Sequence, residues 1–124
     1  MSAAQLSPAI PLAVFRLLAG LSLVGIAMQF FLAGMTVFGA GSGWDAHAAT
    51  GGAVGLPILG LFLMSFLPAL REQRRLASLL FALYVLQLTL AGLGHGLPLI
   101  GALHPVNGLL LGLAAAKLTL KRTA

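Results

Sequence analysis

The sequence contains no cysteine and only two acidic residues among its 124. Without a thiol, the chain forms no disulfide, binds no haem through thioethers, ligates no iron–sulfur cluster and performs no thiol catalysis. The two acidic residues, Asp45 and Glu72, fall on opposite membrane faces in the topology derived below, which excludes a paired-carboxylate site. No phosphate-binding loop, dinucleotide fingerprint or nucleophile elbow is present. We therefore expect no catalytic activity of the chain's own.

Charge of either sign is also scarce. Charged residues make up 7% of the chain and hydrophobic residues 60%, whereas soluble domains are about 25% charged. A soluble core of this size has no room for so much apolar surface, but a lipid bilayer accommodates it. The composition predicts an integral membrane protein.

Four apolar runs are long enough to cross the ~30 Å hydrocarbon core of a bilayer. They cover about residues 17–38, 46–70, 76–95 and 104–120. Because the connections between them are short, the sequence predicts an all-α, up-down-up-down transmembrane four-helix bundle, with residues 1–124 as a single domain.

Local signals mark the boundaries of these spans. The glycine-rich turn "GAGSGWDA" separates the first two, with Trp44 placed as an interface anchor and Asp45 expected to cap the second helix. Pro57 predicts a kink inside the second span, and "REQRR" is expected to close that span. Pro105 is favoured in the first turn of the fourth.

The positive charges predict the orientation. Arg16 lies just before the first long apolar run. The other basic residues lie in the loop after the second span and at the C-terminus: Arg71, Arg74, Arg75, Lys117, Lys121 and Arg122. The opposite loops carry no lysine or arginine. The positive-inside rule then predicts both termini in the cytoplasm of a bacterial inner membrane. The net charge of +5 is explained by this distribution, so we expect no nucleic-acid partner.

The three histidines converge on the outer, periplasmic side of this topology. His47 opens the second span, His95 ends the third and His104 opens the fourth. Helices two and four are diagonal partners in an antiparallel bundle of this order, so His47 and His104 are predicted to face each other across the core. A ligand between these helices would be held from both sides.

A glycine stripe follows each of these two histidines. The stretches "HAATGGAVG" and "HPVNGLLLG" share the spacing His-x-x-x-Gly-x-x-x-Gly, which places Gly51 and Gly55, and likewise Gly108 and Gly112, along one helix face. Two such stripes predict a flat slot with an imidazole at the top of each wall. Haem b, with His47 and His104 as axial ligands, is the simplest occupant because it requires no cysteine.

Other interpretations of these residues stay open. The occupant is alternatively bacteriochlorophyll, or there is none, because small-x-x-x-small spacing is also a generic helix-packing device and histidines occur at membrane interfaces. His95 is an alternative iron ligand or a contact for a haem propionate. Gln29 and Gln87 are expected to form interhelical hydrogen bonds, and Tyr84 is expected to pack. The spread of the histidines over three elements gives only a weak signal for zinc or copper.

The segments "LHPVNGLLL", "WDAH" and "FFLAG" carry a family resemblance. Together they resemble an uncharacterised family of small bacterial four-helix membrane proteins, with a Leu-His-Pro-x-Asn signature opening the last helix and a histidine opening the second. The resemblance implies the four-helix fold and the importance of His47, His104 and Asn107, and it supplies no activity. The paired histidines are also similar in layout to membrane b-type cytochromes, an analogy without a shared signature.

Two functions follow as hypotheses. The first is a small membrane haem b protein that serves in electron transfer or as a subunit of a membrane redox complex. The second is a non-catalytic accessory or assembly subunit of a larger membrane complex, such as a pigment-binding photosynthetic one. In both cases the expected partners are the lipid bilayer and other membrane subunits or further copies of the chain.

Overall fold

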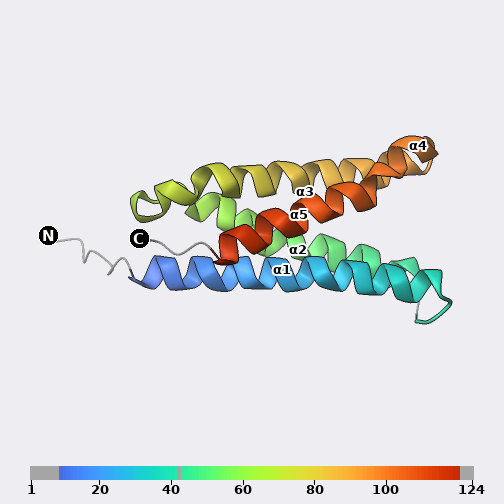
Figure 1. Cartoon of the computed structure of the whole chain (residues 1–124), viewed down its shortest axis with the longest axis horizontal. Helices are drawn as coiled ribbons and strands as arrows, with labels where there is room; N and C mark the ends of the chain where they lie inside the picture. The colour runs from blue at the N-terminus through green and yellow to red at the C-terminus, as the bar shows by residue number, and fades with distance from the viewer. Residues whose placement is uncertain (1–8, 42, 121–124) are drawn as a thin grey trace, which may run out of the picture.

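The computed structural model describes residues 9–41 and 43–120, and these residues are helical apart from short turns (Figure 1). The elements are α1 (Ala9–Val37), α2 (Trp44–Met64), the 3-10 helix η1 (Pro68–Gln73), α3 (Arg74–Gly94), α4 (Pro98–Gly101) and α5 (Leu103–Leu120). No strand occurs in this part of the chain. The predicted all-α fold is confirmed.

Within the part of the chain that the structure describes, four helical segments are long and apolar enough to cross a membrane. They are α1, α2, η1 with α3 (Pro68–Gly94), and α4 with α5 (Pro98–Leu120). Helices suit a bilayer because they satisfy backbone N–H and C=O groups internally. Hydroxyl groups within them are satisfied in the same way: Ser22, Thr36, Thr89 and Thr119 each donate to the carbonyl oxygen four residues earlier.

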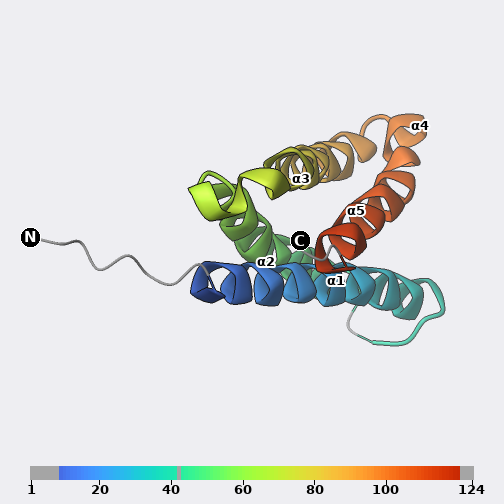
Figure 2. The ribbon, with the colours of Figure 1, turned by 60° about the vertical axis from the view of Figure 1, so that its left-hand side comes forward.

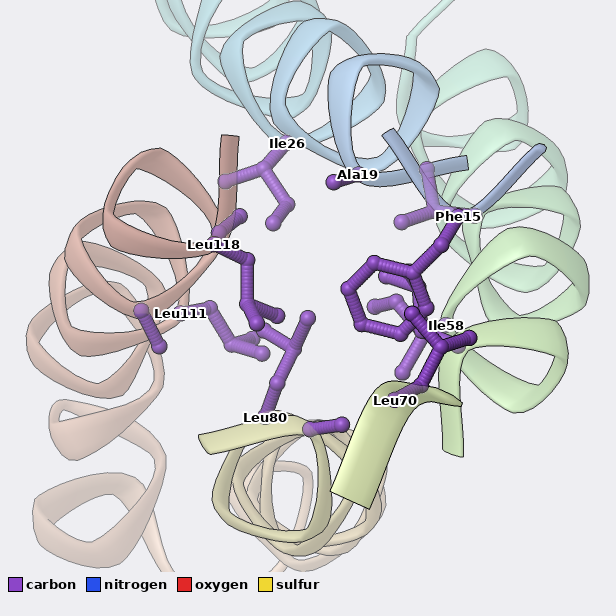
Figure 3. Packing of buried hydrophobic residues seen from close by; sticks show 13 residues of the cluster. Phe15, Ala19, Ile26, Ile58, Leu70, Leu80, Leu111 and Leu118 are labelled. Atoms are coloured by element: carbon purple, nitrogen blue, oxygen red, sulfur yellow. The ribbon is translucent and has the colours of Figure 1, made fainter. Parts of the chain in front are cut away.

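The helices form the predicted antiparallel bundle. Both α1 and α3 pack against α2 and against α5, so α2 and α5 occupy opposite corners, as Figures 2 and 3 show. The start of α1, the segment η1 and the end of α5 share one end of the bundle, and the α1–α2 turn and α4 share the other (Figure 1). The diagonal placement of α2 and α5 is therefore as predicted.

Hydrocarbon side chains fill the half of the bundle near η1. Phe15, Ile58, Leu70 and Leu80 are almost completely buried there. In Figure 3 they point from α1, α2, η1 and α3 toward the centre, with Leu118 of α5 opposite. This packed layer stabilises the bundle at the end that carries the arginines.

Two helix boundaries differ from the sequence prediction. The first helix begins at Ala9 instead of about residue 17, and α2 ends at Met64 instead of about residue 70. The second difference follows from Pro68, which forces Leu67 into an extended conformation (φ −64°, ψ 139°). Arg74 of "REQRR" then donates from Nε to the Ser65 carbonyl oxygen (3.2 Å), so it caps the end of α2 from the start of α3.

The expected cap of α2 is wrong. Gly43, with φ 78°, is the N-cap residue, and no side chain caps the helix. Asp45 instead lies within the first turn, where its negative charge favours the helix dipole. The turn before it passes through Gly39, Gly41 and Gly43, all with positive φ, a region that glycine adopts without strain.

The two prolines inside α2 and α5 sit differently in their helices. α2 continues through Pro57 as one helix. Pro105 lies in the first turn of α5, as predicted. At that position its missing N–H removes no helical hydrogen bond.

The bundle repeats one helical hairpin. The buried positions 15, 19 and 22 in α1 recur 58 residues later at positions 73, 77 and 80, and positions 54, 58 and 61 in α2 recur 57 residues later at 111, 115 and 118. Identical residues accompany them, including the pairs Arg16/Arg74, Gln29/Gln87 and His47/His104. The hairpin α1–α2 therefore corresponds to α3–α5, and matching helices run in the same direction on opposite corners.

Candidate functional site

A cavity of about 670 Å³ opens among all four spans in the half of the bundle away from η1. Its wall contains all three histidines of the chain together with Gln29, Gln87 and Tyr84. The volume lies within the range of about 300–1,000 Å³ that is typical of small-molecule and cofactor sites. The cavity brings together side chains that are up to 85 residues apart, from Ile26 to Leu111.

His47 enters this cavity from the first turn of α2. Its Nδ1 lies 3.1 Å from the carbonyl oxygen of Gln29 on α1. A carbonyl oxygen only accepts, so Nδ1 carries the proton and Nε2 carries the lone pair. The Trp44 ring meets the His47 ring edge-on, with centroids 5.5 Å apart. Among the described residues, no donor bonds the Nε2 of His47.

His104 is held on both nitrogens by one residue of α3. Its Nδ1 lies 3.1 Å from the carbonyl oxygen of Gln87, and its Nε2 lies 3.2 Å from the side-chain nitrogen of the same glutamine. Asn107 lies one turn further along α5. Its Nδ2 donates to the Leu83 carbonyl oxygen at 2.9 Å and to Gln87 Oε1 at 2.7 Å. The four groups form one continuous network.

Backbone carbonyls fix the direction of every hydrogen bond in this network. The Leu83 carbonyl accepts, so the NH₂ of Asn107 faces it, and the second N–H of that group donates to Gln87 Oε1. The NH₂ of Gln87 must then face His104, whose Nε2 accepts because its Nδ1 already donates to the Gln87 carbonyl. His104 is therefore the neutral Nδ1–H tautomer, with its lone pair engaged by Gln87.

The two imidazole rings face each other across the bundle. Their centroids are 6.1 Å apart and their planes are inclined by 60°. Two imidazoles that bind one iron from opposite sides lie about 6 Å apart, because two metal–nitrogen bonds of about 2 Å and two ring radii separate the centroids. Each ring also donates Nδ1–H to a backbone carbonyl, the usual arrangement for a metal-binding histidine. The separation of the two rings matches that of two ligands of one iron, and His104 would bind it in exchange for its hydrogen bond from Gln87.

The glycines that follow the two histidines are placed unequally. Gly51 and Gly108 lie in the cavity wall, whereas Gly55 and Gly112 do not. A Cβ at Gly51 would lie 2.9 Å from Gln29 Oε1, and one at Gly108 would lie 3.4 Å from Gln87 Nε2. The glycine four residues after each histidine thus makes room for the glutamine of the neighbouring helix rather than only for a flat ligand.

The lower glycine in each stripe lies behind a side chain that belongs to the cavity wall. A Cβ at Gly55 would lie 2.5 Å from Tyr84 Oη, and one at Gly112 would lie 3.7 Å from Ile26. These two positions therefore admit close helix packing.

His95 lies in the cavity wall at the end of α3, where it is exposed. Within residues 9–41 and 43–120, no group of three or more His, Cys, Asp or Glu side chains is arranged to hold a metal ion. The structure therefore brings His47 and His104 together as a pair and leaves His95 outside it.

Hydrogen bonding gives Tyr84 a larger part than the sequence indicated, and it separates the two glutamines. Tyr84, expected only to pack, donates from its hydroxyl to the Gly51 carbonyl oxygen (3.0 Å) and so joins α3 to α2. The interhelical hydrogen bonds expected of Gln87 are confirmed. The side-chain nitrogen of Gln29, in contrast, is buried without a partner. Gln29 and Gln87 are 58 residues apart, and His47 and His104 are 57 residues apart. This near-equal spacing is the sequence signal that pairs each glutamine with a histidine.

Fold and cavity together define an all-helical protein with four segments of membrane-spanning length and a histidine-lined cavity near one end of the bundle. A family of unknown function, DUF6220, matches residues 29–95. This match covers more than half of the 124 residues, and the chain belongs to that family. The matched region includes Gln29, His47 and Gln87 and ends before His104. No curated protein and no solved structure matches the chain.

Proposed function

We propose that the protein is a small integral membrane haem b protein in which His47 and His104 hold the iron. The observation that carries this proposal is the facing imidazole pair, with centroids 6.1 Å apart on diagonal helices. The match to the spacing required for axial ligation supports it, as do the Nδ1–H bonds to the Gln29 and Gln87 carbonyls.

The surroundings of the pair also favour a large, mostly apolar ligand. The cavity wall includes Ile26, Phe30, Val54 and Leu111 along with the polar side chains. Apolar walls with a few placed polar groups are typical of cofactor sites. Haem b bound here would supply one-electron redox chemistry. The chain itself would bind the group, orient it between α2 and α5, and exclude water from the side that faces the packed core.

The proposal also includes a membrane location and an orientation. Arg16, Arg71, Arg74, Arg75 and Lys117 belong to the end of the bundle opposite the histidines, while Asp45 belongs to the histidine end. This distribution supports a bacterial cytoplasmic membrane with the histidines toward the outer surface.

The test is cofactor content. The protein is purified in mild detergent, its oxidised and dithionite-reduced spectra are recorded, and haem is identified by the pyridine haemochrome method alongside an organic pigment extract. We expect haem b. Long-wavelength pigment bands would instead identify a bacteriochlorophyll protein. A folded but colourless protein that takes up no added haemin would contradict the proposal and leave the accessory-subunit hypothesis.

Three substitutions locate the site. We expect His47→Ala to lose haem, and His104→Ala to weaken haemin binding by about tenfold or more, because each removes a ligand. His95→Ala is the matched control, since His95 lines the same cavity without facing the pair, and we expect it to keep its haem. Equal haem content in all three variants would place the ligands elsewhere.

A further inference from the structure

The two copies of the glutamine–histidine unit differ in one respect. In both copies, the histidine Nδ1–H donates to the backbone carbonyl oxygen of the glutamine, with 3.1 Å between nitrogen and oxygen. Only in the second copy does the glutamine side chain also reach the histidine, through the 3.2 Å contact between Gln87 Nε2 and His104 Nε2. The side-chain nitrogen of Gln29 remains buried without a partner. The lone pair of His47 is thus open to a ligand, whereas that of His104 is occupied.

The residue three positions after each histidine accounts for this difference. In α5 it is Asn107, which is 4% exposed and holds Gln87 Oε1 at 2.7 Å. In α2 it is Thr50, and no hydrogen bond joins Thr50 to Gln29 among the described residues. A threonine has a shorter side chain and one O–H, so it lacks the NH₂ group that lets Asn107 bond a backbone carbonyl and a glutamine at once.

We propose that Asn107 and Gln87 form a latch that competes with the iron for the Nε2 lone pair of His104, so that His104 is the displaceable one of the two ligands and a small diatomic molecule can bind in its place. This inference rests on the proposed haem site. The Nε2 of His104 has one lone pair, which either accepts the Gln87 N–H or binds a metal. His47 has no such competitor and is the permanent ligand.

The latch keeps the His104 side of the site open to ligands. While Gln87 retains the imidazole, a coordination position on that side is available to carbon monoxide, nitric oxide or dioxygen. The cavity wall there includes the apolar side chains of Leu111 and Phe30, with Phe30 Cζ 3.2 Å from the position of a Cβ at Gly108, which suits a small neutral ligand. Gln87 and Asn107 are positioning residues, because they act through His104.

Carbon monoxide is the probe for the open position. In the haem-loaded, dithionite-reduced protein, we expect fast binding of carbon monoxide and a ferrous spectrum with a five-coordinate fraction. We expect Asn107→Thr, which copies the first hairpin, to release Gln87, give a six-coordinate low-spin spectrum and slow carbon monoxide binding by about tenfold or more. Gln87→Met, which fills similar volume but donates no hydrogen bond, should act in the same direction. Thr50→Val is the matched control and should leave the rate unchanged.

A second measurement needs no haem. In the apo protein with ¹⁵N-labelled histidine, the side-chain nitrogen shifts of His104 should show a protonated Nδ1 and a hydrogen-bonded, unprotonated Nε2. Asn107→Thr should move the Nε2 shift of His104 toward that of a free lone pair and leave His47 unchanged.

The outcomes separate the two proposals. A His104 with a protonated Nε2, or one that does not respond to Asn107→Thr, overturns the latch whether or not haem binds. A haem-loaded wild type that is wholly six-coordinate and binds carbon monoxide no faster than Asn107→Thr overturns the displaceable ligand. A chain with the expected nitrogen shifts that takes up no haem would retain the latch and refute both the haem site and the diatomic ligand.

Discussion

Backbone carbonyl groups orient most of the polar side chains between helices in this bundle. His47, His104, Tyr84 and Asn107 each donate to a carbonyl oxygen on a neighbouring helix. A helical carbonyl retains a second lone pair after its own helical hydrogen bond, so it is the acceptor most readily available where charged side chains are rare. Since these acceptors cannot rotate, they fix tautomers and amide orientations around the cavity.

Close contact at Gly55 provides a residue-scale prediction. A Cβ there would lie 2.5 Å from Tyr84 Oη and 2.8 Å from the Cζ atom of that ring. The ring is stiff, and its hydroxyl is bonded to α2. We therefore expect Gly55→Ala to lower the free energy of unfolding by about 1–3 kcal/mol, as overpacking does, measured as a lower Tm in detergent.

Gly52 is the matched control for that substitution. It lies on the same helix, and no atom outside that helix's own backbone lies within 4 Å of the position that a Cβ would take. We expect Gly52→Ala to leave Tm unchanged or slightly raised, because alanine is the better helix former. Equal destabilisation by both changes would show that helix α2, and not the Tyr84 contact, is the source of the effect.

Sequence spacing predicted the approach of the two histidines but not the hydrogen bonds around them. The convergence of His47 and His104 follows from helix order and from the positions of the two residues near helix starts. The network through Gln87 and Asn107 does not, because it depends on side-chain reach between helices. The cap expected from Asp45 failed because a positive-φ glycine, Gly43, lets the helix start two residues earlier than predicted, at Trp44.

At the scale of elements, the turn between α3 and α5 depends on two glycines in contact. A Cβ at Gly101 would lie 2.6 Å from the Cα atom of Gly94, so the backbones of α3 and α4 touch. This approach sets where α5 begins, and His104 is its second residue. The hairpin geometry thus bears directly on the site.

Gly101→Ala tests that relation. Because the clash is with backbone, which has little room to yield, we expect a loss of about 1–3 kcal/mol in unfolding free energy and weaker haemin binding through displacement of His104. Gly96→Ala, in the same turn with nothing within 4 Å, should change neither quantity. Thermal unfolding and haemin titration of the two variants provide the comparison, and a stable Gly101→Ala protein would refute the backbone contact.

The number and order of helices were predictable from hydropathy, but their ends were not. Apolar runs mark the membrane-spanning parts, whereas α1 starts at Ala9, beyond the predicted run. The segment η1 arises from Pro68 and from capping by Arg74, a contact between two elements that a linear pattern does not contain. The hairpin repeat, in contrast, is visible in the sequence once the glutamines and histidines are aligned together.

At the scale of the whole molecule, the charge distribution predicts one orientation, and the absence of cysteine makes it measurable. Ala40 is exposed in the α1–α2 turn and Ala69 is exposed in η1. The positive-inside rule predicts that a membrane-impermeant maleimide reaches Ala40→Cys from outside the cell and Ala69→Cys only after permeabilisation. The parent chain offers no background thiol, and the reversed labelling pattern would refute the orientation.

The packed hydrocarbon side chains in Figure 3 make the two halves of the bundle different, because the cavity lies only in the other half. The centre of the arginine-bearing half is filled by the buried side chains of Phe15, Ile58, Leu70 and Leu80. This half is therefore a layer of hydrocarbon between the cavity and the charged surface. A single centre confined to one half of a ~30 Å barrier does not form a wire across it. With the proposed haem bound, we expect electrons or ligands to be exchanged at the histidine-bearing surface or within the plane of the bilayer, and not across it.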